Sequence, residues 1–233
     1  MRVALPEFEN SMTTAQKVWG FIYLPLHMFV LPLFLSMLAA YLPEQLDEIT
    51  LNVAYYAMGF GFCLLLMWRY LRHSFDLLCD NVPLNIAAFI CAFALYFFLN
   101  ILASVALLAV LGDELLNPNN AALSELAESN SGVMWGLSVF LAPLAEEILF
   151  RGVLFGSLRG KNRTLAFAIS IAAFGIYHLW QSALVEMDWR VFLYALQYIA
   201  PGYALAWLYE KTSCIWLPIF MHMLINLAAM LIL

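Results

Sequence analysis

Three ionisable side chains stand close together in a stretch that is otherwise apolar. Residues 141–151 read Leu-Ala-Pro-Leu-Ala-Glu-Glu-Ile-Leu-Phe-Arg. On a helix, Glu147 and Arg151 lie four residues apart on one face and can pair, whereas Glu146 is rotated by about 100° from Glu147. An ionised side chain at the centre of a bilayer costs about 2.5–3.5 kcal/mol on insertion scales, so such residues indicate function. We therefore interpret Glu147–Arg151 as an ion pair and Glu146 as the free acid.

Other apolar runs carry the remaining candidates for chemistry. They are His178, with Phe174 four residues before it, and His222, with Asn226 four residues after it. Counted from the nearest basic residue at the expected inner boundary, Glu146, His178 and His222 lie 13, 15 and 11 residues away. At a helical rise of ~1.5 Å per residue, all three reach a similar depth of roughly 16–23 Å. Three separate helices can therefore build one composite site.

The chemistry of such a site is peptide hydrolysis. A free carboxylate beside a histidine can orient and deprotonate a water, and a second histidine with an amide can donate hydrogen bonds to an oxyanion. Glu146, His178 and His222 could alternatively hold zinc with one open position. The H-E-x-x-H pattern of zincins is missing from the sequence. Spacing alone leaves the metal-free and the metal-assisted mechanisms both open.

Composition decides the class of protein that must position these residues. The chain has 233 residues, of which 65% are hydrophobic and 11% are charged, and its mean hydropathy is +0.86. Soluble domains are ~45–50% apolar and ~25% charged, so this is an integral membrane protein. A nucleic-acid role lacks support because the sequence has no basic patch. The four cysteines show no C-x-x-C or metal spacing, so we interpret them as free thiols.

Apolar runs of about 20 residues predict an all-α, polytopic bundle of about seven transmembrane helices, with six to eight possible. The chain is expected to form one membrane domain over residues 1–233, with the motifs in about 130–233. The seven runs are residues 18–41, 51–71, 84–111, 132–157, 164–184, 190–209 and 214–233.

Loop charges predict the orientation of the bundle. With the N-terminus inside, the inner loops hold eight Lys and Arg residues and the outer loops hold only Arg190. By the positive-inside rule this asymmetry places the N-terminus in the cytoplasm and the C-terminus outside, and we expect a bacterial plasma membrane.

Backbone breakers and one further histidine complete the intramembrane features. Pro143 cannot donate to the carbonyl of Val139, so we expect it to kink or restart the fourth helix. Glu146 would then lie in the first turn after the break, near the positive end of a helix dipole. We expect His27, in the first run, to hydrogen-bond a neighbouring helix.

Taken together, the motifs resemble those of the CPBP family of intramembrane proteases, which includes CAAX prenyl endopeptidases and bacteriocin-processing or self-immunity proteins. Residues 146–151 match E-E-x-x-x-R, residues 174–178 match F-x-x-x-H, and residues 222–226 match H-x-x-x-N, in the family's order. The resemblance covers roughly residues 130–230. It implies an intramembrane endopeptidase, of either the glutamate or the metalloprotease type.

The resemblance also implies a role for each matching residue. Glu146 would be the general base, and His178 would help to hold the attacking water. His222 and Asn226 would form the oxyanion site. The supporting or substrate-binding residues would be Glu147, Arg151 and Phe174.

Two other functions remain open from the sequence. A catalytically silent scaffold or immunity protein would keep the fold and act by binding a partner. A proton-coupled transporter would also place acids and histidines in the membrane, although we find no internal repeat. For the peptidase, the expected partners are membrane lipid and a membrane-embedded or lipid-anchored peptide or protein substrate.

Overall fold

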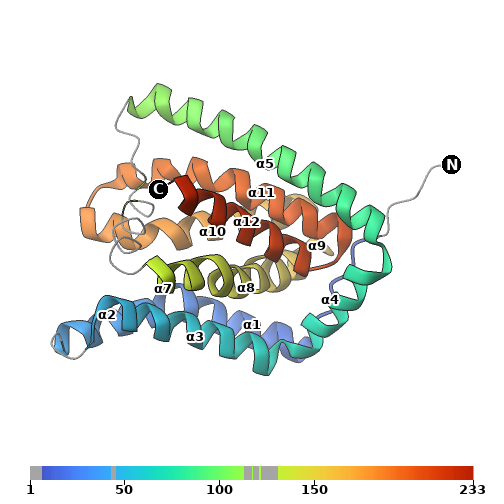
Figure 1. The fold of residues 1–233 in the computed structure, drawn as a ribbon, viewed down its shortest axis with the longest axis horizontal. Helices are drawn as coiled ribbons and strands as arrows, with labels where there is room; N and C mark the ends of the chain where they lie inside the picture. The colour runs from blue at the N-terminus through green and yellow to red at the C-terminus, as the bar shows by residue number, and fades with distance from the viewer. Residues whose placement is uncertain (1–6, 43–45, 113–116, 118–120, 122–130, 233) are drawn as a thin grey trace.

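The computed structural model describes residues 7–42, 46–112, 117, 121 and 131–232. Within this part of the chain every regular element is a helix (Figure 1). The all-α membrane bundle predicted from the apolar runs is therefore confirmed.

Among the residues that the structure describes, five helices are long and apolar enough to cross a membrane: Thr14–Tyr41, Ile49–Leu66, Val82–Leu111, Arg163–Glu186 and Arg190–Thr212. The first comprises α1 (Thr14–Pro25), the π-helical segment η1 (Leu26–Val30) and α2 (Leu31–Tyr41). The second lies in α3 (Glu48–Leu66), and the third is α5 (Val82–Leu111). The fourth is α10 (Arg163–Glu186), and the fifth joins η4 (Trp189–Tyr194) to α11 (Ala195–Thr212). The last apolar run forms the shorter α12 (Trp216–Ile232).

The motif-bearing run before α10 is a helical rod of five consecutive segments. These are α7 (Ser131–Gly136), the π segment η2 (Leu137–Leu141), α8 (Ala142–Glu147), the π segment η3 (Ile148–Phe155) and α9 (Gly156–Arg159). Pro143 lies at the N-terminus of α8, where the register changes from π to α, and the chain stays helical across it. Because Glu146 is the fifth residue of α8 within this continuous rod, the prediction that it lies in a first turn was wrong.

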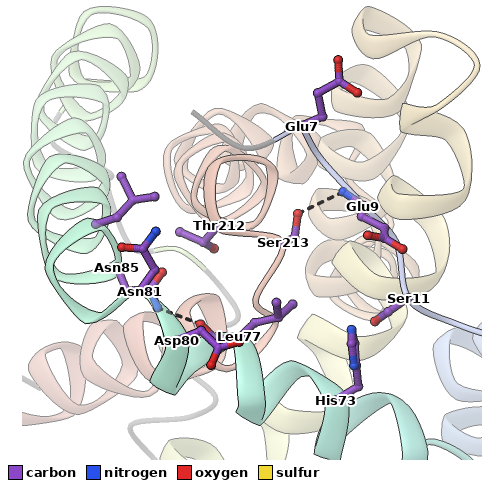
Figure 2. Close-up of a pocket in the computed structure, with 11 residues that line it drawn as sticks. Glu7, Glu9, Ser11, His73, Leu77, Asp80, Asn81, Asn85, Thr212 and Ser213 are labelled. Atoms are coloured by element: carbon purple, nitrogen blue, oxygen red, sulfur yellow. Dashed lines mark hydrogen bonds between the residues drawn. The ribbon is translucent and has the colours of Figure 1, made fainter. Parts of the chain in front are cut away.

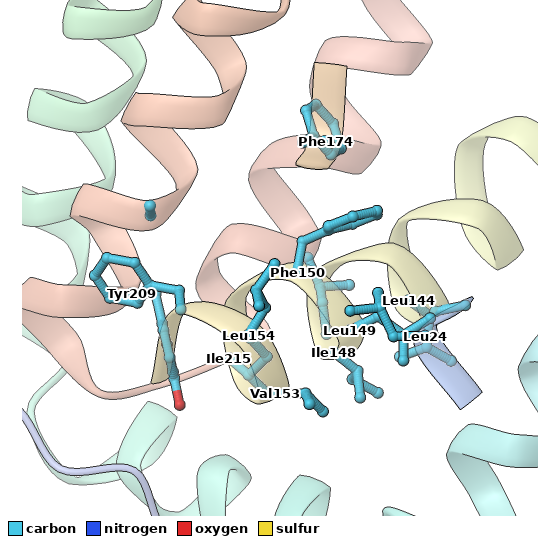
Figure 3. Packing of buried hydrophobic residues seen from close by; sticks show 14 of the residues in the cluster. Leu24, Leu144, Ile148, Leu149, Phe150, Val153, Leu154, Phe174, Tyr209 and Ile215 are labelled. Atoms are coloured by element: carbon cyan, nitrogen blue, oxygen red, sulfur yellow. The ribbon is translucent and has the colours of Figure 1, made fainter. Parts of the chain in front are cut away.

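The rod lies in the middle of the bundle (Figure 1). The helices α1, α2 and α3 cover one side of it, while α10, α11 and α12 cover the other, and α5 packs outside α11. Ile148, Leu149 and Phe150 on the rod are fully buried in the main apolar core (Figure 3). Charged groups placed on this rod are therefore shielded from solvent on both sides.

Two features at the ends of the bundle add to the predicted spans. Residues 72–80, predicted as part of an inner loop, belong to the helix α4 (Trp68–Asp80), which joins α3 to α5. At the same end, Glu210 on α11 pairs with Arg159 on α9 and with Arg163 on α10. This cluster ties together the ends of the rod and of the two helices behind it.

On the outer side, α5 presents large apolar side chains to the surroundings. Phe97, Phe98, Ile101 and Val105 are each about half exposed or more. A soluble protein would bury such a face, so this surface fits contact with lipid tails.

Candidate active site

The Glu147 carboxylate contacts two nitrogen groups through the same oxygen atom. Its Oε1 accepts from Nη1 of Arg151 at 2.9 Å and contacts Nδ1 of His222 at 2.8 Å. The side chains of Glu147 and Arg151 are fully buried. The predicted Glu147–Arg151 pair is confirmed, and the structure adds His222 from α12 as a second partner.

Glu146 faces the two histidines predicted to lie at its depth. Its Oε2 lies 3.6 Å from Nε2 of His178 and 3.9 Å from Nε2 of His222. The residue is 4% exposed, and Oε2 makes no hydrogen bond to any residue that the structure describes. Both distances are too long for direct hydrogen bonds but allow one water to contact all three atoms. The predicted convergence of three helices on Glu146 is confirmed.

Hydrogen-bond chemistry assigns a role to each histidine nitrogen. Nδ1 of His178 lies 2.9 Å from the carbonyl oxygen of Phe174, which can only accept. Nδ1 of His178 therefore carries a proton, as does Nδ1 of His222 because it faces the Glu147 carboxylate. In each ring, Nε2 is left to face Glu146, and in the neutral form it has a free lone pair.

Aromatic side chains surround these polar groups. The Phe174 ring is 1% exposed and packs on His178 and His222, with centroid distances of 4.5 and 5.8 Å. The guanidinium carbon of Arg151 lies 4.2 Å from the centroid of the same ring. Phe174 therefore contacts Arg151, His178 and His222 at once.

Asn226 contacts the rod about two helical turns before Glu146. Its Nδ2 donates to the carbonyl oxygen of Ser138 at 2.8 Å. That carbonyl needs a donor because the rod is π-helical here: the N–H of Ala142 bonds to Leu137, and the next residue is Pro143, which has no N–H. The sequence prediction placed the freed carbonyl at Val139, whereas the π register places it at Ser138. One of the two amide hydrogens of Asn226 is used in this bond.

Tyr198 contacts the site but was missed by the sequence analysis. Its ring stacks on the His178 imidazole, with centroids 4.6 Å apart and planes 27° apart. Its hydroxyl accepts from the amide of Asn117, which precedes the rod in the chain. A tyrosine in an apolar helix gives no signal of its own in a single sequence, so only packing reveals this contact.

His27 lies close to these groups, on the opposite side of the rod. It is fully buried, and its Nε2 lies 3.4 Å from the hydroxyl of Tyr177 on α10. The predicted hydrogen bond to a neighbouring helix is confirmed.

In the metal-assisted alternative, Glu146, His178 and His222 would be the residues that hold a zinc ion. In the part of the chain that the structure describes, no group of three or more His, Cys, Asp and Glu side chains is placed to hold a metal ion. The facing atoms of Glu146, His178 and His222 can also contact one water molecule.

A separate pocket lies at the α4 end of the bundle. It has a volume of about 240 Å³ and is lined by residues that include Glu9, His73, Asp80 and Ser213 (Figure 2). None of the predicted site residues lines it.

Comparison with known proteins agrees with the motif-bearing region. Residues 128–228 match the family model described as "Type II CAAX prenyl endopeptidase Rce1-like". The chain is 32% identical over 148 residues to "Putative membrane peptidase YdiL" of Bacillus subtilis, which is 63% of this chain and 56% of that protein. It is 33% identical over 73 residues to "UPF0177 protein YxdF" of Lactococcus lactis, which is 31% of this chain and 34% of that protein. The chain thus spans about half or less of the length of these relatives, and no solved structure matches it.

Proposed function

We propose that this chain is an intramembrane protease of the CPBP family and that it hydrolyses peptide bonds of membrane-associated peptides or proteins; the match to the Rce1-like family model and the similarity to a membrane peptidase support this. The single observation that carries the proposal is the position of Glu146. Its unpaired carboxylate oxygen faces Nε2 of both His178 and His222 at depth in the bundle. An acid that served only packing would be neutralised like its neighbour Glu147.

In this mechanism Glu146 is the general base. A water held between its Oε2 and Nε2 of His178 gives one proton to Glu146, while the water oxygen attacks the carbonyl carbon of the scissile peptide. When the tetrahedral intermediate collapses, the C–N bond breaks and Glu146 returns the proton to the leaving nitrogen. A positioned carboxylate of this kind contributes about 10²–10⁴ in rate.

His222 and Asn226 stabilise the oxyanion. His222 donates from Nε2 when that nitrogen is protonated, and its ring is oriented by Glu147 at Nδ1. Asn226 donates the amide hydrogen that the Ser138 carbonyl does not use. Glu147 and Phe174 hold the ring of His222 by direct contact, and Arg151 holds Glu147 in place. The mechanism uses no metal.

The substrates that fit such a buried site reach it through the membrane, so we propose membrane-embedded or lipid-anchored peptides. We also propose a bacterial plasma membrane with a cytoplasmic N-terminus. The basic residues Arg159 and Arg163 at one end of the bundle support this orientation by the positive-inside rule.

The test compares peptide termini in membranes that contain wild-type protein, Glu146→Gln or Glu186→Gln. Glu186 ends α10 and is exposed, so it controls for the same chemical change away from the site. We expect a set of termini that wild type and Glu186→Gln produce and Glu146→Gln does not.

A chelator added to the wild-type sample should leave these termini unchanged. If Glu146→Gln produces them at the wild-type rate, Glu146 is not the base. If wild-type membranes yield none and Glu146→Ala still works in the cell, a scaffold or immunity role replaces proteolysis.

A further inference from the structure

His27, Tyr55 and Tyr177 form a second buried polar cluster, beside the candidate site. The His27 imidazole stacks on both tyrosine rings, with centroids 4.7 Å from Tyr55 and 5.6 Å from Tyr177. The Tyr55 hydroxyl lies 3.0 Å from the His27 carbonyl and 3.0 Å from the Tyr177 hydroxyl. The three residues come from η1, α3 and α10, so one cluster joins three helices.

The backbone explains why the His27 carbonyl takes a side-chain donor. In the π segment η1, the N–H of Leu31 bonds to Leu26, five residues before it. In the same register the donor for His27 would be residue 32, which is a proline and has no N–H. A buried carbonyl without a hydrogen-bond partner destabilises the fold, and the Tyr55 hydroxyl supplies that partner here.

Counting protons fixes the direction of every bond in the cluster. Tyr55 has one hydroxyl hydrogen, which the His27 carbonyl takes, so Tyr177 must donate to Tyr55. The Tyr177 hydrogen is then used, so the contact at 3.4 Å between Tyr177 and Nε2 of His27 requires a proton on Nε2. The bonds close a circuit from His27 through Tyr177 and Tyr55 back to His27. Nδ1 of His27, which is buried and has no partner among the described residues, is left bare.

The circuit touches the candidate site through Tyr177. Its ring meets the His178 ring edge-on, with centroids 4.9 Å apart, and contacts Phe150, which also packs on Phe174. A change in the position of Tyr177 therefore shifts the helical turn that carries His178.

We propose that His27, Tyr55 and Tyr177 are positioning residues that hold His178 in the orientation where Nε2 faces Glu146. Two of them, His27 and Tyr55, lie outside the region that matches the family model, so the N-terminal helices have a direct part in building the site. The catalytic consequence rests on the proposed function. The tautomers assigned to His27 and His178 do not depend on the proposed function.

The test is nitrogen NMR of full-length protein with labelled histidine in lipid bilayers. The chain has only four histidines, so each signal can be assigned by substitution. In wild type we expect His27 protonated at Nε2 and bare at Nδ1, and His178 protonated at Nδ1 and bare at Nε2. Tyr55→Phe keeps the stacked ring but removes the donor, so the signals of both histidines should move.

Tyr23→Phe is the matched control. The Tyr23 ring also lies against His27, at 5.6 Å, but its buried hydroxyl has no partner among the described residues. Its loss should leave the His178 signals in place. A His27 ring protonated at Nδ1 overturns the circuit, and His178 signals that do not respond to Tyr55→Phe overturn the positioning role. If Tyr55→Phe does not fold, Tyr177→Phe removes the central hydroxyl and is judged by the same signals.

Cleavage gives a second, independent readout. A displacement of about 1 Å can lower a rate by about 10²-fold, so the release of Glu146-dependent termini should fall by about tenfold or more in Tyr55→Phe and not in Tyr23→Phe. If Glu146→Gln changes no termini, the proposed function fails while the NMR result still decides the circuit. If the termini depend on Glu146 and Tyr55→Phe cuts at the wild-type rate, the positioning role fails alone.

Discussion

Two π segments in this protein share one backbone defect and use it differently. In η1 and in η2, the carbonyl of the second residue faces a proline five positions later, so His27 and Ser138 both lack a backbone donor. Another helix supplies the donor in each case: the hydroxyl of Tyr55 for His27 and the amide of Asn226 for Ser138.

The two donors differ in how many hydrogens remain available after they bond to the backbone carbonyl. A tyrosine hydroxyl has one hydrogen, so Tyr55 has no further hydrogen to donate once it bonds to the His27 carbonyl. The hydrogen bonds around His27 therefore form a closed circuit. An asparagine amide has two hydrogens and a carbonyl, so Asn226 satisfies Ser138 and keeps one N–H for another acceptor. A carbonyl without a backbone donor therefore holds two helices together at His27. At Ser138 it orients an asparagine side chain that can still bind another group.

The largest effect is expected from substitution of Asn226, the donor that keeps one amide hydrogen free. Asn226→Leu leaves the Ser138 carbonyl unsatisfied and removes a donor to the oxyanion. We expect the rate of Glu146-dependent cleavage to fall by about 10²–10³, and the free energy of unfolding to fall by about 1–3 kcal/mol. Cleavage in membranes and unfolding in detergent micelles measure the two separately. If stability falls but the cleavage rate is unchanged, Asn226 has only a structural role, like that of Tyr55.

A smaller effect is expected at the closed circuit. Tyr55→Phe should lower the free energy of unfolding by about 1–3 kcal/mol because the His27 carbonyl loses its donor. Tyr23→Phe removes a hydroxyl without a hydrogen bond and should leave stability unchanged or raise it. Denaturation of both variants in the same micelles checks the difference. Equal stability of the two would contradict the role of the His27 carbonyl.

The smallest effect tests the prolines themselves. Pro143→Ala supplies a backbone N–H near Ser138, so in the Asn226→Leu background it should recover about 1 kcal/mol of stability but none of the cleavage. Pro32→Ala should do the same for Tyr55→Phe. Unfolding of the two double variants against their single parents measures the recovery. Recovery of cleavage by Pro143→Ala would show that Asn226 acts through the helix and not on the substrate.

Much of this arrangement could be read from residue types and spacing. The apolar runs predicted the spans, and the i,i+4 spacing of Glu147 and Arg151 predicted their pair. Counting residues from the basic ends placed Glu146, His178 and His222 at one depth, because the rise along a helix is nearly constant. These inferences depend on distance along a single helix, which the sequence states directly.

Other features depended on contacts between helices. From an assumed α-helical register, we predicted that Pro143 leaves the Val139 carbonyl without a backbone donor. In the observed π register the carbonyl without a backbone donor is that of Ser138. Which residue fills that defect is a matter of packing, as is the sharing of Glu147 between Arg151 and His222. Tyr198 and the circuit of His27 also needed coordinates, since aromatic residues are common in apolar helices and carry no spacing signal.

By itself, the sequence determined that this is a membrane bundle with one free acid among histidines and an asparagine. The hydrophobic length of a run is a property of that chain segment alone, so it does not depend on how the helices pack. The tertiary structure decided which donor forms a hydrogen bond with which acceptor. Buried donors and acceptors must be paired, and the partners lie on helices far apart in the chain.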